Sequence, residues 1–162
     1  MHPSIPHTTS ESSAPPHADA PSHNRSDDAA ELFSRIRFVL TATDVKPAVV
    51  NKTLHETLVI ACAEGLKGTH YGFGDLNSQV ESIVRMLRIP AGEAAAIRRM
   101  RRHSNHSDAL SADDMRYDAQ ALAGLVSRIY GARLPEDLTK LLPHGPQKAA
   151  KGLHVNAADK RC

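Results

Sequence analysis

The residues of this chain best suited to chemistry lie between positions 98 and 106, in the sequence Arg-Arg-Met-Arg-Arg-His-Ser-Asn-His. This short run brings together four guanidiniums and two imidazoles. Arginine forks match phosphate oxygens, and histidine can exchange a proton near neutral pH. The run therefore predicts a site for a phosphodiester. By itself it leaves open whether the chain cuts nucleic acid, only binds it, or pairs with acidic residues of a partner protein.

The charge balance along the sequence favours an external anion at this run. Arg98 and Arg102 are neighbours on one helix face, where like charges repel. The nearest carboxylates in the sequence are Glu93 and Asp108, a small counterweight to the cations of the run. The alternative is a solvated helix face, where cations near the carboxyl end of a helix interact favourably with its dipole.

Arg101 and His106 have four residues between them, and this spacing resembles the HEPN superfamily of small helical bundles, which are marked by an Arg and a His four to six residues apart. The resemblance covers about residues 75 to 131 and is strongest to the HEPN-like domains of restriction systems and helicase-associated proteins. It implies a homodimer in which two Arg and His pairs line one cleft. It also implies a metal-independent endoribonuclease of a toxin or defence system, with RNA as the favoured ligand.

Carried over to this chain, the resemblance implies that His106 is the general acid or base and that Arg101 stabilises the phosphorane charge. Arg98 and His103 have the same spacing, so the register stays open. Arg102 stands where active members commonly have Asn, Asp or His, and many HEPN-like domains are noncatalytic. The alternative function is therefore a noncatalytic nucleic-acid- or protein-binding module related to the N-terminal part of a helicase-type protein. The expected nucleic-acid-binding residues are Arg98, Arg99, Arg102, His103 and Asn105.

We expect neither a metal nor a cofactor. His103, His106 and Asp108 could ligate a metal ion, but the surrounding guanidiniums oppose a cation. The glycine-rich segment 68–74 lacks the Gly-Lys-Ser/Thr ending and the preceding strand of a phosphate-binding loop.

The rest of the sequence predicts a cytoplasmic protein without a membrane partner. No apolar stretch approaches the length of a membrane span, and the amino terminus lacks a signal pattern. We interpret the two cysteines, Cys62 and Cys162, as free thiols of a reducing compartment, with Cys62 acting as a small apolar residue.

Composition and periodicity predict an all-α fold, a compact antiparallel bundle of about five helices. The chain is 41% hydrophobic but only 4% aromatic, so its core must be aliphatic. Segment 1–26 is rich in Pro, Ser, His and Ala and predicts a disordered tail, 27–142 is the bundle domain, and 143–162 is a flexible basic tail. A bundle with a purely structural role in oligomerisation is a third interpretation.

Caps and apolar stripes delimit the helices. Asp28, Asp75 and Ser111 are the expected amino-terminal caps, Pro47 is a first-turn proline, and Gly131 is a helix stop. The expected helices cover 29–42, 48–67, the segment from the Asp75 cap to Ile89, 91–103, and the segment from the Ser111 cap to Gly131, with a short helical turn over 138–142.

Overall fold

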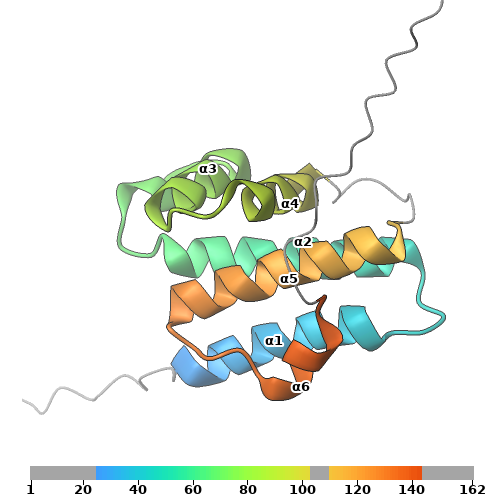
Figure 1. The fold of residues 1–162 in the computed structure, drawn as a ribbon. Helices are drawn as coiled ribbons and strands as arrows, with labels where there is room; N and C mark the ends of the chain where they lie inside the picture. Colours follow the sequence, from blue (N-terminus) through green and yellow to red (C-terminus); the bar gives the residue numbers. More distant parts are fainter. Residues whose placement is uncertain (1–24, 103–109, 144–162) are drawn as a thin grey trace, which may run out of the picture.

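The computed structural model describes residues 25–102 and 110–143, and within these residues it contains helices and no strands (Figure 1). The predicted all-α bundle is therefore confirmed for the described part of the chain. The elements are α1 (Arg25–Thr41), α2 (Pro47–Gly65), the 3-10 helix η1 (His70–Phe73), α3 (Leu76–Met86), α4 (Ala91–Arg102), α5 (Ala112–Tyr130) and α6 (Glu136–Leu141).

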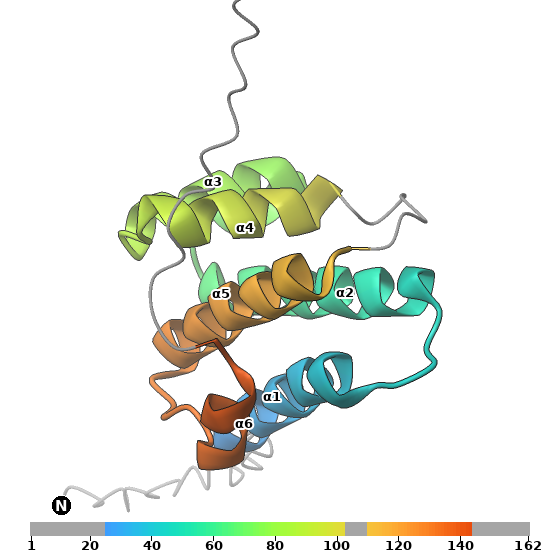
Figure 2. The same cartoon turned by 45° about the vertical axis from the view of Figure 1, so that its right-hand side comes forward.

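The helices form three layers. α2 and α5 lie side by side in the middle, α3 and α4 cover them on one side, and α1 and α6 lie on the other (Figures 1 and 2). α1 is antiparallel to both central helices, whereas α2 and α5 run in the same direction. Gly65 at the end of α2 accordingly lies against Ile129 near the end of α5. The hairpin of α3 and α4 makes this arrangement possible, because it returns the chain to the end of the bundle where α2 began.

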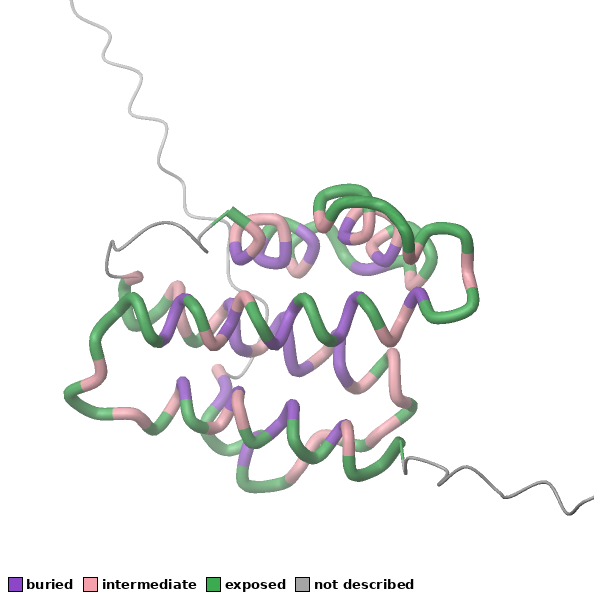
Figure 3. The backbone as a smooth tube through the Cα atoms, turned by 180° about the vertical axis from the view of Figure 1, so that it is seen from behind, coloured by how far each residue is buried: buried purple, intermediate pink, exposed green. Residues whose placement is uncertain are grey.

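The core is aliphatic, as the composition predicts. Figure 3 shows that the buried residues of the helices face the interior of the bundle. Completely buried residues include Leu58 of α2 and Leu122 of α5 in the middle layer, and Ile97 of α4 in the layer of α3 and α4. Burial of such stripes is the main source of stability for helices of this length.

The caps predicted for α3 and α5 are confirmed. A side-chain oxygen of Asp75 accepts a hydrogen bond from the backbone N–H of Ser78 at 2.7 Å. Ser111 Oγ accepts one from the backbone N–H of Asp114 at 3.0 Å. Gly131 ends α5 in the left-handed conformation with φ 63°, which glycine adopts without a steric cost. These interactions satisfy backbone groups that a helix end leaves unpaired.

Several helix boundaries differ from the predictions, including three at the ends of α1, α2 and α3 that differ by two residues or more. α1 begins at Arg25, so Asp28 lies inside the first turn and is not the cap. The added turn is stabilised by its acidic residues, which favour a helix amino terminus, and by Arg25, which approaches Glu64 of α2 at 3.9 Å. α3 ends at Met86 and α2 at Gly65, both earlier than expected. The predicted tails lie outside the described residues apart from Arg25, Ser26 and Pro143.

We expect Leu58→Ala to lower the free energy of unfolding by about 2 to 5 kcal/mol, because it removes a completely buried side chain and leaves a cavity. The neighbouring residue Val59 is exposed, and Val59→Ala should change the unfolding free energy by less than about 0.5 kcal/mol. Urea unfolding followed by circular dichroism measures both. Equal effects of the two substitutions would contradict the assigned inner face of α2.

Candidate nucleic-acid interface

The four arginines at the end of α4 do not form a single array. Successive side chains on an α-helix point about 100° apart, and the inner face of α4 is occupied by the buried residues Ile97 and Met100. The guanidiniums of Arg98 and Arg101 contact residues of α3, and that of Arg99 contacts residues of α5. Arg102 is exposed. The local helix geometry thus directs the cations to different neighbours.

Arg98 is neutralised within the fold by Glu81 of α3. Arg98 Nε donates to Glu81 Oε1 and Nη2 donates to Oε2, each at 2.7 Å. This parallel pair of hydrogen bonds lowers the pKa of the Glu81 carboxyl, with a further contribution from the positive charges of Arg98, Arg101 and Arg85. Arg98 therefore joins α3 to α4.

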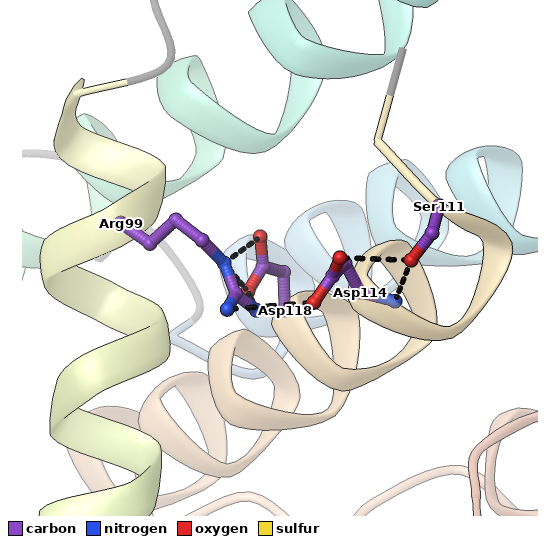
Figure 4. Close-up of polar contacts among 4 residues, drawn as sticks. All are labelled: Arg99, Ser111, Asp114 and Asp118. Atoms are coloured by element: carbon purple, nitrogen blue, oxygen red, sulfur yellow. Dashed lines mark hydrogen bonds and ion pairs between the residues drawn. The ribbon is translucent and has the colours of Figure 1, made fainter. Parts of the chain in front are cut away.

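Arg99 is neutralised by two carboxylates of α5 (Figure 4). Its Nη2 lies 2.5 Å from Asp118 Oδ1, and its Nε donates to the same oxygen at 3.1 Å. Its Nη1 lies 3.5 Å from Asp114 Oδ1. Burial by itself lowers the pKa of Arg99, but the hydrogen bonds and charge of Asp118, together with Asp114 and Tyr117, raise it above its ordinary value.

The same cluster connects α4 to the cap of α5. The hydroxyl of Ser111 donates to Asp114 Oδ2 at 2.8 Å while its oxygen accepts from the Asp114 backbone N–H (Figure 4). Asp114 therefore contacts the capping serine through one oxygen and Arg99 through the other. The first turn of α5 and the last turns of α4 are held together at this point.

Arg101 is positioned by a side-chain amide of α3. Its Nη1 donates to the side-chain oxygen of Asn77, in the first turn of α3. Its Nε is buried and has no hydrogen-bond acceptor among the residues that the structure describes. The charge of Arg101 contributes to the lowered pKa values of Asp75 and Glu81.

Arg102 is the most accessible of the four. Its side chain is exposed. Its Nε donates to the backbone carbonyl oxygen of Arg98 at 3.5 Å, which is a long and therefore weak hydrogen bond. Within the described parts of the chain, no carboxylate forms an ion pair with Arg101 or Arg102. Of the four guanidiniums, these two are therefore the ones that no carboxylate of the described residues neutralises.

The sequence-based count of acidic neighbours was wrong for this region. Glu93 forms an ion pair with Arg128 of α5 at 2.6 Å and not with the arginine run. The acids that neutralise the run come from other helices, which distance along the sequence does not reveal. For Asp118, the sequence did contain an indication that the side chain is buried and needs a partner. Asp118 falls on the apolar stripe of α5, four and seven positions before Leu122 and Leu125, and a carboxylate at such a position requires a partner.

The histidines of the run cannot be placed. His103, Asn105 and His106 lie outside the described residues, as does Asp108. The predicted pair of Arg101 and His106, the alternative register and the metal-binding alternative therefore stay predictions.

Cys62 is a buried thiol in the core, in agreement with its predicted apolar role. Desolvation by burial raises the pKa of its thiol to about 12, so the thiol stays protonated and unreactive at neutral pH. Cys162 lies outside the described residues. None of the helices that the structure describes combines the length and the apolar character needed to cross a lipid bilayer.

Comparison with protein-family models, with curated proteins and with solved structures found no match to this chain. The resemblance to the HEPN superfamily thus rests on the residues between 75 and 131 alone.

We expect Arg99→Ala to lower the free energy of unfolding by about 2 to 3 kcal/mol, because it deprives the completely buried carboxylate of Asp118 of a charged partner. This is below the full value for a buried pair because the Arg99 side chain is 33% exposed. Arg102→Ala removes an exposed side chain of the same type and should change stability by less than about 0.5 kcal/mol. Urea unfolding of both variants tests this, and a destabilising Arg102→Ala together with a neutral Arg99→Ala would contradict the assignment.

We also expect the pair of Arg98 and Glu81 to make stability depend on pH. A carboxylate whose pKa is lowered on folding stabilises the protein above its unfolded pKa, and this contribution is lost as the pH falls through the folded pKa. Glu81→Gln should therefore destabilise the protein at neutral pH, and the difference from wild type should disappear on acidification from about pH 5 to pH 2. Glu31→Gln, in an exposed pair with Arg35, is the control and should leave the profile close to that of wild type. A constant difference across this range would disprove the linkage.

Proposed function

We propose that the surface at the carboxyl end of α4 binds the phosphate backbone of RNA through Arg101 and Arg102. The proposal rests on one observation, which is that only two of the four arginines of α4 are paired with acidic residues of the fold. Arg98 and Arg99 are neutralised by acids of the fold, whereas no carboxylate of the described residues pairs with Arg101 or Arg102. Two adjacent guanidiniums without a carboxylate partner favour the approach of a polyanion.

The geometry of Arg101 adds to this argument. Its side chain is half-buried and its Nη1 donates to Asn77, so part of the entropic cost of holding it in place has already been met by folding.

The preference for RNA as the ligand rests on the sequence. The sequence also raises the question whether the chain cleaves RNA or only binds it. The run continues from Arg102 into His103, Asn105 and His106, and its spacing resembles that of HEPN domains. The proposal accordingly includes a cytoplasmic location, a homodimer and a role in a toxin or defence system. A noncatalytic module that binds nucleic acid, or an acidic protein partner, is the alternative that the experiments below separate from it.

Salt dependence of binding tests the phosphate contacts. We expect a labelled single-stranded RNA to bind with an affinity that falls as salt rises, and we expect Arg101→Ala and Arg102→Ala each to reduce the log-log slope by about 0.7. Fluorescence anisotropy between about 50 and 200 mM salt measures this. Arg133→Ala is the matched control, because Arg133 is exposed but follows the carboxyl end of α5, whereas Arg99 near the carboxyl end of α4 contacts the first turns of α5. Wild-type slopes in both test variants, or no binding at all, would refute the proposal, and binding of an acidic peptide instead would favour the alternative.

Cleavage is tested separately from binding. If the resemblance extends to catalysis, the wild-type protein should shorten RNA in the presence of a chelator. His106→Ala should abolish this breakdown with binding near the wild-type level, because a general acid or base acts on the reacting atoms rather than on affinity. His103→Ala is the control for the register, since it tests the other Arg and His pair. Intact RNA with all three proteins, with binding retained, would identify the chain as a binding module.

A further inference from the structure

Phe73 is an aromatic ring that the fold leaves almost entirely in water. It is 94% exposed and belongs to η1, the single turn of 3-10 helix between α2 and α3. Among the residues that the structure describes, no other large hydrophobic side chain is more than 45% exposed. Exposed apolar residues scattered singly are ordinary, so the ring gains significance only from its setting.

The turn that carries Phe73 is held by hydrogen bonds on both sides of the ring. The side-chain amide of Gln79 in α3 donates to the carbonyl of Gly72 at 3.2 Å and to the carbonyl of Gly74 at 2.8 Å. At the start of the turn, Thr69 Oγ1 donates to the carbonyl of Leu66 at 2.7 Å. The two residues that flank Phe73 are therefore tied to the rigid helix α3. A ring presented in this way loses little conformational entropy when it binds a flat partner.

The turn is separated by only a few residues from the part of α3 that contacts the proposed phosphate-binding surface. Phe73 precedes Asn77 by four positions, which limits their Cα separation to about 15 Å, and Asn77 accepts the hydrogen bond from Arg101. One short strand of nucleic acid can therefore reach both the ring and the guanidiniums.

The charges around the turn are compatible with this arrangement. Lys67 lies on the same connection as Phe73 and forms an exposed ion pair with Glu64 of α2 at 3.5 Å. Asp75 is the nearest acid in sequence, and its carboxylate is engaged as the cap of α3 by the backbone N–H of Ser78. Bases stack on exposed aromatic rings while cations nearby contact the backbone, the combination typical of proteins that bind single strands.

We propose that Phe73 is a stacking platform for an unpaired base of the RNA held at Arg101 and Arg102, and that the site therefore selects single-stranded over double-stranded RNA. This inference rests on the proposed function and adds the substrate class. In a duplex the base faces are stacked on one another and are not available to the ring, so only the phosphate contacts would remain.

The natural chain contains no tryptophan, so Phe73→Trp provides a single fluorescent reporter at the proposed platform. We expect a single-stranded RNA oligonucleotide to quench its emission and the same sequence annealed into a duplex to leave it unchanged. Phe38→Trp is the matched control, because Phe38 is 43% exposed but belongs to α1, in the layer opposite α3 and α4. Its emission should not respond to either RNA.

A second variant separates stacking from charge. Phe73→Ala should weaken binding of single-stranded RNA about tenfold without changing the slope of affinity against salt, because it removes a stacking contact and no phosphate contact. Arg102→Ala should instead change the slope. Circular dichroism confirms that each variant is folded.

The outcomes distinguish the two proposals. Quenching of Phe73→Trp by single strands alone, with weaker binding by Phe73→Ala, supports the platform. Salt-dependent RNA binding with wild-type affinity in Phe73→Ala, or equal affinity for duplex and single strand, overturns the platform and leaves the proposed function in place. Absence of RNA binding by the wild-type protein overturns both, and an apolar pocket of a partner protein would then be the alternative ligand of the ring.

Discussion

The carboxylate of Asp118 is completely buried in α5, and the position of α4 depends on how this charge is compensated. An ionised carboxylate in an apolar interior is costly unless it is paired and hydrogen-bonded. Arg99 meets this requirement only if the last turns of α4 lie over the first turns of α5. The requirement therefore aligns the two helices more narrowly than apolar contacts alone, because a shift along the helix axis would separate the ion pair.

The four arginines of α4 accordingly fall into two groups. Arg98 and Arg99 join α4 to α3 and α5, and their charges are used inside the fold. Arg101 and Arg102 follow on the same helix but have no such carboxylate among the described residues. Substituting the whole run would confuse loss of stability with loss of binding, so the two groups must be examined one residue at a time.

The helices were predictable where a local interaction marks their ends. Asp75 and Ser111 cap α3 and α5 as expected, because a side chain of this type satisfies backbone N–H groups only a few positions away. The start of α1 was not predictable from Asp28, since the extra turn is stabilised by contacts of Arg25 with α2 and α5. Of the candidate site, the sequence indicated the cationic residues but not which of them would be neutralised.

The sequence by itself determined the helical class, the aliphatic core and the presence of a cationic run, because these depend on composition and on spacing along one helix. Tertiary structure alone decided that Glu81, Asp114 and Asp118 neutralise two of the four arginines, and that Arg101 contacts Asn77, four positions after Phe73. These partners lie 15 to 24 positions away in the chain. Ion pairs and amide contacts act over a few ångströms in space, and only the packing of α3, α4 and α5 brings such residues within that distance.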